Sequence, residues 1–188
     1  MKQDLEAQLN LPVFEIPTLP PSIPGMRLSR LLIGAVEEAG GRVFEGMQVI
    51  SADVEDGYLA TLWTEAAGRR KSHPARKFVL ATGGILGGGL RAGLDGEIRE
   101  TALGLPVSLP LRREDWFQRE FLSSSGHPIF QAGIATDGEF QPVDASGNHI
   151  YDNLYIAGAA LGGGDYIRER SLEGVSLVSG ILIGKKIT

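Results

Sequence analysis

The sequence predicts an α/β fold, and three observations predict it. Apolar residues recur at helical spacing between residues 26 and 39, and strand-like runs flank an Asp-Gly turn signal at residues 56–57. Two further apolar runs, 77–82 and 153–158, each lead into glycine. Helical and strand periods in one chain, with strands that are apolar throughout, are typical of a sheet covered by helices.

Composition excludes several function classes. With 188 residues, 43% of them hydrophobic, the chain is long enough to bury a core without disulfides or metal ions. It has no cysteine, which excludes disulfides, thiolate catalysis and iron–sulfur ligation within these residues. A net charge of −5 argues against a broad nucleic-acid-binding face, and we interpret the short basic clusters 69–71 and 112–113 as solvated turn residues.

No targeting or membrane-spanning segment is predicted. The first residues contain no apolar stretch, so we expect no signal peptide. The longest apolar run, 175–183, is interrupted by serine and glycine and is too short to cross a bilayer. Any contact with a membrane should therefore come through a partner protein.

The front of the chain is rich in proline, and residues 1–24 form a predicted strap. Five of the ten prolines lie between residues 11 and 24, where fixed φ angles and missing donors favour an extended path over a helix. A domain rarely begins in this way, so we expect further chain before residue 1.

Two elements follow the strap. The apolar spacing predicts a helix over 26–39, ended by Gly40-Gly41, and residues 42–44 are interpreted as a short strand. The runs 48–55 and 58–64 predict a β-hairpin around Asp56-Gly57.

The rest of the chain divides into one domain and an inserted lobe. Residues 77–82 are apolar on both faces, as in a central buried strand. Residues 97–135 show no strong period and are interpreted as an irregular cap. The predicted domain therefore comprises 25–96 and 136–188, and it ends with the buried strand 153–158 and a helix from about residue 175.

The ends of the two apolar strands are the candidate binding site. Open α/β sheets bind ligands at the carboxyl ends of their strands, where glycine lets the backbone approach a ligand. The first end carries Ala81, Thr82, Gly83 and Gly84, and the second carries Gly158 and Ala159. Two such ends favour a nucleotide cofactor, although each alone could be a tight turn.

The start of the last helix adds a third element to this site. Gly174, Val175 and Ser176 lie where free N–H groups would face a phosphate or the carbonyl edge of a flavin ring. Ser176, Gly180 and Gly184 recur every four residues and form a face of small side chains. Close packing of that face on a sheet is the alternative interpretation.

Other site types are disfavoured. No G-x-G-x-x-G follows a strand near the start, and there is no Walker A lysine, H-E-x-x-H or G-x-S-x-G. The three histidines, His73, His127 and His149, are far apart in sequence, so we expect no metal site. For His127 a solvated loop position is favoured over a role as general base.

These motifs resemble those of a flavoprotein family. Val79–Gly84 is similar to the A-T-G-G element of fumarate reductases and glycerol-3-phosphate dehydrogenases, and 133–159 is similar to the flavin-binding ending of that class. Residues 11–28 resemble the middle of the B-subunit family of anaerobic glycerol-3-phosphate dehydrogenase, as does Leu161–Asp165 near the end of the chain. The chain as a whole resembles the C-terminal half of that family.

The resemblance implies a partial FAD/NAD(P)-binding-like flavoprotein domain with a β-hairpin layer and an irregular cap. It implies a flavin, FMN or FAD, and two partners, a catalytic A-subunit plus an iron–sulfur C-subunit. The complex would oxidise glycerol 3-phosphate to dihydroxyacetone phosphate and pass electrons to quinone. The protein would be cytoplasmic, peripheral at the inner face of the membrane through a partner.

The family's N-terminal glycine motif should precede residue 1, so the pyrophosphate site is expected to be incomplete here. These residues alone are expected to be inactive and to form homo-oligomers that cover apolar sheet surface. Another flavin oxidoreductase of the fumarate reductase class, or a flavin-free scaffold or assembly module, remains an alternative function.

The resemblance transfers cofactor contacts but no catalytic residue. The transferred contacts are Ala81, Thr82, Gly83, Gly84, Gly158, Ala159, Gly174, Val175 and Ser176. Ala159 stands where many relatives in the wider class carry glutamate. Arg27 and Arg168 are candidates for the phosphate of the substrate.

Overall fold

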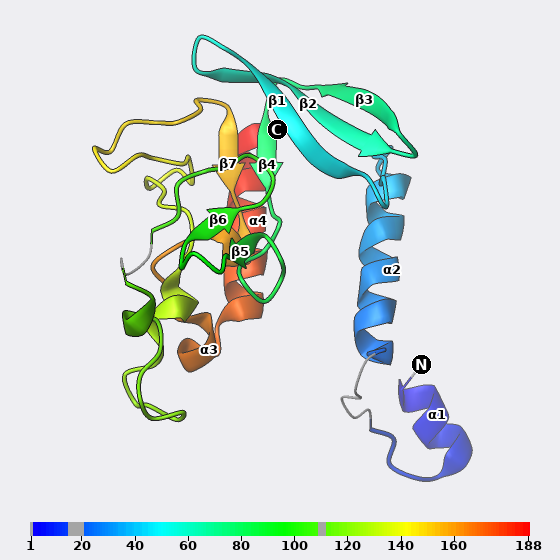
Figure 1. The fold of residues 1–188 in the computed structure, drawn as a ribbon. Coiled ribbons are helices and arrows are strands. Elements are labelled where there is room, and N and C mark those ends of the chain that lie inside the picture. The colour runs from blue at the N-terminus through cyan, green and yellow to red at the C-terminus, as the bar shows by residue number, and fades with distance from the viewer. Residues whose placement is uncertain (1, 15–20, 109–111) are drawn as a thin grey trace. The chain divides into compact units, whose positions relative to one another are not determined.

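A computed structural model describes residues 2–14, 21–108 and 112–188 of the chain. The chain forms two compact units, Met1–Gly46 and Met47–Thr188, which are described separately (Figure 1). The predicted division into strap, domain and cap stays a prediction.

The unit Met1–Gly46 contains two helices, α1 (Lys2–Leu9) and α2 (Ile23–Glu38). Ser22 caps α2 by accepting a hydrogen bond from the N–H of Gly25 at 3.2 Å. The helix ends at Glu38, and Gly40 follows the C-cap residue Ala39 with φ +83°, so the predicted helix and its glycine stop are confirmed.

Three details of this unit differ from the sequence prediction. Helix α1 was not predicted, and α2 begins at Ile23 and includes Pro24, because proline is tolerated in the first turn of a helix. Residues 42–44 do not form a strand. The middle of the predicted strap, 15–20, lies outside the described residues.

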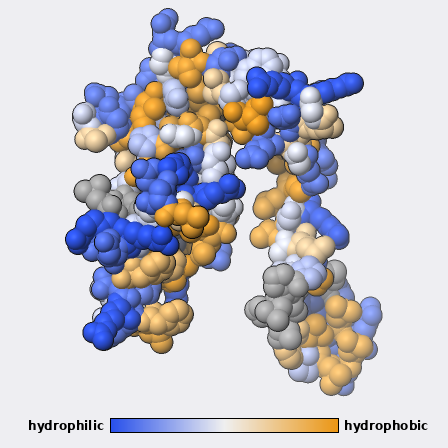
Figure 2. Space-filling view, viewed as in Figure 1, coloured by the Kyte–Doolittle hydropathy of each residue, from blue (hydrophilic) through white to orange (hydrophobic). Residues whose placement is uncertain are grey.

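Neither helix of this unit buries a residue. Figure 2 shows hydrophobic side chains at its surface, and large apolar side chains such as Phe14 (79% exposed) and Leu31 (72% exposed) contribute to it. Helix formation in proteins depends mainly on tertiary packing of an apolar face. The exposed apolar face of α2 is therefore a surface that other protein normally covers.

The unit Met47–Thr188 begins with a three-stranded antiparallel sheet. It consists of β1 (Gln48–Glu55), β2 (Tyr58–Ala66) and β3 (Arg69–Pro74), in that order. Asp56 and Gly57 connect β1 to β2 with φ angles of 48° and 83°, the conformation that a two-residue hairpin turn requires. The structure therefore has the hairpin that the Asp-Gly signal predicts.

The third strand corrects the interpretation of residues 69–71 as turn residues. They lie in β3, with their side chains exposed along an edge strand, and the turn before them is Ala67-Gly68. Exposed basic residues on an edge strand discourage pairing with other chains.

The centre of this unit is a parallel pair of strands, β4 (Phe78–Leu80) and β7 (Leu154–Ile156). Figure 1 shows the two strands side by side, with the long helix α4 (Leu172–Ile187) behind them. Ile183 of α4 is 1% exposed and packs against Tyr155 and Ala157. On β4, Phe78 and Leu80 are buried but Val79 is 42% exposed, so this strand is not buried on both faces as predicted.

Asn153 joins the antiparallel sheet to the parallel pair. Its side chain accepts the N–H of Leu59 at 2.9 Å and donates to the carbonyl of Leu59 at 2.8 Å and to that of Arg76 at 3.1 Å. Its own carbonyl accepts the N–H of Phe78 at 2.9 Å. Because Leu59 is 1% exposed, the amide of Asn153 takes the place of a neighbouring strand for that residue.

The remaining elements are short. An antiparallel pair, β5 (Leu90–Ala92) and β6 (Ile98–Glu100), follows the glycine-rich turn after β4 and was not predicted. Then come η1 (Arg113–Asp115), η2 (Pro128–Gln131), η3 (Gly158–Ala160) and α3 (Tyr166–Glu169). Among residues 2–14, 21–108 and 112–188, no helix is both long and apolar enough to cross a membrane.

Candidate functional site

The ends of β4 and β7 meet in space. Because the strands are parallel and paired in register, their carboxyl ends lie at the same edge. A Cβ atom added to Gly84 would lie 2.7 Å from the carbonyl oxygen of Ala159, so the two turns are in direct contact. Gly83 and Gly158 have φ angles of 83° and 67°, a conformation that favours glycine. The backbone conformation of these glycines therefore allows the two turns to lie in contact.

A cavity of about 490 Å³ opens at these strand ends. Its volume lies within the range of sites for drug-sized ligands. It is lined by strand ends and turns (Val79, Ala81, 83–87, 157–159), by Ile129, Phe130 and Ala132, by Tyr166 and Ile167 of α3, and by Leu172, Ser176 and Gly180 of α4.

The lining is almost entirely apolar. None of the described residues that line the cavity carries a charge, and the polar side chains among them are Tyr166 and Ser176. Phosphate groups normally need cationic side chains or several free N–H donors. The side chains of the lining therefore offer no charge to a phosphate, and they suit an uncharged ring system.

The structure brings six of the nine predicted contact residues to this cavity: Ala81, Gly83, Gly84, Gly158, Ala159 and Ser176. Thr82 instead lines a second, apolar cavity of about 310 Å³ beside Leu62 and Phe78. Gly174 and Val175 do not line either cavity. Contact of any of these residues with a flavin stays a prediction.

The start of α4 differs from the predicted one. The helix begins at Leu172, after Ser171, so Gly174 to Ser176 already lie inside it. The N–H of Val175 donates to the carbonyl of Ser171 at 2.8 Å and is therefore not free for a ligand.

The cavity meets the side of α4 rather than its end. Leu172, Ser176 and Gly180 line it at intervals of four residues, which places them on one face of the helix. A Cβ atom added to Gly180 would have no neighbour within 4 Å. The face of small residues thus borders open space at Ser176 and Gly180, and the residues that pack inward are Ser179 and Ile183.

Ser179 fixes this helix to the end of β7. It is 2% exposed, its hydroxyl accepts the N–H of Gly158 at 2.9 Å, and it donates to the carbonyl of Val175 at 2.6 Å. Ser176 donates to the carbonyl of Leu172 at 2.9 Å, which leaves its oxygen able to accept a bond from a ligand.

Tyr166 and Phe130 form aromatic parts of the lining that sequence reasoning missed. The Tyr166 hydroxyl donates to the carbonyl of Leu161. Burial raises the pKa of Tyr166, and the charge of Glu169 raises it further. Both aromatic rings come from segments without a periodic pattern, so the sequence carried no signal for them.

The two candidate substrate arginines belong to different helices. Arg168 lies on α3, with its Cδ atom 3.4 Å from a Cβ atom added to Gly126. Arg27 belongs to α2 in the other unit. Neither is among the residues that line the cavity.

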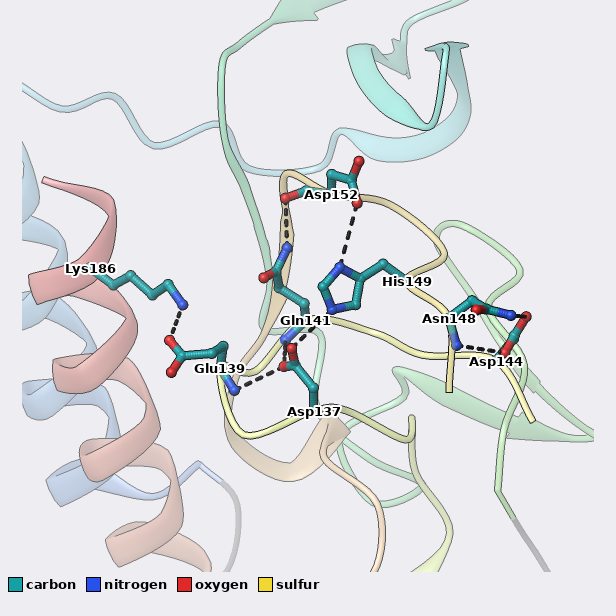
Figure 3. A network of polar contacts seen from close by, with 8 residues as sticks. All are labelled: Asp137, Glu139, Gln141, Asp144, Asn148, His149, Asp152 and Lys186. Carbon is teal, nitrogen blue, oxygen red and sulfur yellow. Dashed lines mark hydrogen bonds and ion pairs between the residues drawn. The ribbon is translucent and has the colours of Figure 1, made fainter. Parts of the chain in front are cut away.

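Several ionisable side chains lie together in the loop 137–152 (Figure 3). Asp137 accepts the N–H groups of Glu139 and Gln141, each at 2.9 Å, and lies 3.0 Å from Nε2 of His149. Burial opposes ionisation, but these hydrogen bonds hold the pKa of Asp137 below its ordinary value. The backbone donors occupy its carboxylate, so this network stabilises the loop.

Lys186 of α4 pairs with Glu139 and extends this network to the last helix (Figure 3). Across the described ranges, no group of three or more histidine, aspartate or glutamate side chains is arranged to hold a metal ion.

Three relatives of the chain carry the name of the same enzyme subunit. The chain is 36% identical over 184 residues to the probable B-subunit of anaerobic glycerol-3-phosphate dehydrogenase in Halobacterium salinarum, covering 98% of this chain and 42% of that protein. It is 35% identical over 195 residues to the B-subunit of Aliivibrio fischeri, covering 98% of this chain and 42% of that protein. It is 34% identical over 184 residues to the B-subunit of Yersinia pestis, covering 97% of this chain and 42% of that protein.

The chain thus spans less than half the length of these curated relatives. No solved structure matches it. The resemblance to the B-subunit family that the sequence motifs indicated is confirmed. The FAD binding domain model matches residues 1–177, and the chain therefore belongs to the FAD binding domain family.

Proposed function

We propose that the cavity at the ends of β4 and β7 holds the ring system of a flavin. The observation that carries this proposal is the uncharged, glycine-lined cavity of about 490 Å³ in a chain of the FAD binding domain family. Its apolar walls and its two close backbone turns fit a flat aromatic ring. Charged side chains that balance the diphosphate of FAD would have to come from outside this lining.

The residues of the chain would bind and orient the ring. The backbone at Gly83 and Gly158 can approach it closely, because neither residue has a side chain to intervene. The Ser176 oxygen can accept a hydrogen bond, and Tyr166 keeps its proton and contributes an aromatic wall. A bound flavin would supply the ability to accept a hydride and to pass its electrons on singly.

We further propose that the complete protein is the B-subunit of an anaerobic glycerol-3-phosphate dehydrogenase. It would work with a catalytic A-subunit plus an iron–sulfur C-subunit in oxidising glycerol 3-phosphate to dihydroxyacetone phosphate, with quinone as electron acceptor. The names of the relatives support the enzyme class. The complex would lie at the cytoplasmic face of the membrane, to which this protein would attach through a partner.

The segment 97–135 would act as a cap on the flavin, in support of which Ile129, Phe130 and Ala132 form part of the cavity wall. Arg27 and Arg168 stay candidates for the substrate phosphate. Arg168→Ala should then raise KM for glycerol 3-phosphate more than it lowers kcat, and an unchanged KM would exclude that role.

Two glycines of α4 provide a matched test of the cavity. Gly180 lines it and Gly184 does not, yet a Cβ atom added at either position would have no neighbour within 4 Å. Valine is a slightly better helix former than glycine, by roughly 0.3 kcal/mol or more, so neither variant should unfold the helix. Gly180→Val would place its methyl groups in the cavity, whereas Gly184→Val would not.

The measurement is flavin retention by the complete protein after desalting, read from the absorption band near ~450 nm. We expect Gly180→Val to lose the band and Gly184→Val to keep it. Identification of the flavin released on denaturation would decide between FAD and FMN. Equal retention by both variants would exclude this cavity as the site, and absence of flavin from the unmodified protein would favour a flavin-free scaffold.

Exposed apolar side chains on α4 support the proposal that further protein covers this unit. Leu177, Val178 and Ile181 are 65%, 56% and 55% exposed. The 188-residue chain by itself should therefore form homo-oligomers. Elution as a compact monomer in size-exclusion chromatography would contradict this expectation.

A further inference from the structure

His127 closes a loop beside the cavity. The loop comprises residues 117–126 and is called here the 117–126 loop. The backbone N–H of Gln118 donates to Nδ1 of His127 at 3.0 Å, and Nε2 of His127 lies 2.9 Å from the carbonyl oxygen of Phe121. One imidazole thus bonds to two points of the loop backbone.

These two bonds define the protonation state of the ring. Nδ1 accepts a backbone N–H, so it must carry a lone pair rather than a proton. The carbonyl oxygen of Phe121 can only accept, so Nε2 must carry the proton. His127 is therefore neutral and in the Nε2–H tautomer. Protonation would place a second N–H donor against the N–H of Gln118 and break that bond.

The ring also supports the cavity wall. His127 directly precedes η2, and its ring contacts that of Phe130 edge-on, with centroids 5.9 Å apart and planes at 71°. It also contacts the ring of Phe117, with centroids 5.7 Å apart. Phe130 and its neighbour Ile129 line the cavity.

A separate bond ties the same wall to the start of the loop. The N–H of Ile129 donates to the carbonyl of Trp116 at 3.1 Å. Ile129 is 6% exposed and Trp116 is 3% exposed, so this contact is buried. Ile129 is thus held by a hydrogen bond to Trp116, and Phe130 by its contact with the ring of His127.

We propose that His127 is a positioning residue for the cavity wall, and that its neutral form holds Phe130 in place for a bound ring. This rests on the proposed flavin site. Asp165 and Arg168 lie against the adjacent Gly126. The bonds of the imidazole go to backbone atoms, so loss of its lone pair changes the loop directly.

The first experiment reads the tautomer without any flavin. In the complete protein with ¹⁵N-labelled histidine, the two ring nitrogens of His127 should show the Nε2–H tautomer at pH ~7.5. The His127→Asn variant assigns the signals. An Nδ1–H tautomer, a tautomer mixture or a protonated ring at that pH would overturn the proposal.

The second experiment measures the dissociation constant of flavin in variants of His127. At pH ~7.5, His127→Ala removes both backbone bonds of the imidazole and the ring beside Phe130, so we expect binding to weaken about tenfold or more, the effect of losing two hydrogen bonds. In His127→Asn the side-chain oxygen can still accept the N–H of Gln118, so its affinity should lie between those of His127→Ala and the unmodified protein.

His149→Asn is the matched control, because His149 belongs to the loop 137–152 and not to the cavity lining. It should bind flavin as tightly as the unmodified protein. Equal flavin affinity in His127→Ala and the unmodified protein would overturn the positioning role. Absence of flavin binding, with the Nε2–H tautomer present, would refute the flavin site and the positioning role with it while leaving the loop geometry intact.

Discussion

The amide of Asn153 is the contact whose removal should most damage the framework of the site. Asn153→Ala deletes an acceptor for the N–H of Leu59 and a donor to its carbonyl, both within the buried interior. It also removes the bond to the carbonyl of Arg76, a residue at the surface whose carbonyl water can reach. The backbone of Leu59 would lose both partners at once.

The expected cost follows from those two groups. A buried donor or acceptor left without a partner costs roughly 1–3 kcal/mol, so two such groups should lower the free energy of unfolding by about 3 kcal/mol. For a unit of this size the melting temperature should then fall by about 6–12 °C. Asn153→Asp should be at least as damaging, because it turns an oxygen towards two carbonyls and buries a charge.

Urea unfolding followed by tryptophan fluorescence is a suitable assay. The two tryptophans of the chain, Trp63 and Trp116, both lie in the unit that contains Asn153. Asn148→Ala is the control, since Asn148 is exposed and its side chain makes a long 3.4 Å bond to Asp144. That variant should change stability by no more than about 0.5 kcal/mol.

Hydrogen exchange tests the same contact at the amide of Leu59. The amide of Leu59 should be protected in the unmodified chain and should exchange rapidly in Asn153→Ala. If Asn153→Ala cost less than about 1 kcal/mol and the Leu59 amide stayed protected, the amide of Asn153 would not substitute for a strand as argued.

Three further predictions concern other sites. Gly84→Ala should destabilise the unit by about 1–3 kcal/mol and weaken flavin binding, because its Cβ would lie 2.7 Å from the carbonyl oxygen of Ala159; thermal unfolding and flavin titration measure both. Glu100→Gln should cost about 1–3 kcal/mol in urea unfolding, because its two oxygens accept three backbone N–H groups and an amide offers only one oxygen. The lowered pKa of Asp137 adds stability that is complete above the unfolded value of about 3.9 and is lost as the pH falls through the folded value. The stability difference between the unmodified chain and Asp137→Asn should therefore shrink as the pH falls below ~4, and a difference unchanged in acid would contradict the assignment.

Local signals were sufficient for several elements. Asp56-Gly57 predicted a hairpin because few residues adopt positive φ at two successive positions, and the structure has that hairpin. The spacing of apolar residues and Gly40 predicted α2. Strand β3 was missed because its residues, Arg69 to Pro74, are polar and basic, and an edge strand in water needs no apolar pattern.

For the site, the sequence determined which turns carry glycine and therefore which backbones can approach a ligand. It could not determine that Phe130 and Tyr166 complete the lining, since they come from segments without periodicity and meet the strand ends only through packing. Nor could it separate the inward face of α4 from the cavity face, because both contain small or apolar residues. Only the bond from Gly158 to Ser179 and the burial of Ile183 fix the rotation of that helix, and this rotation turns Ser176 and Gly180 towards the cavity.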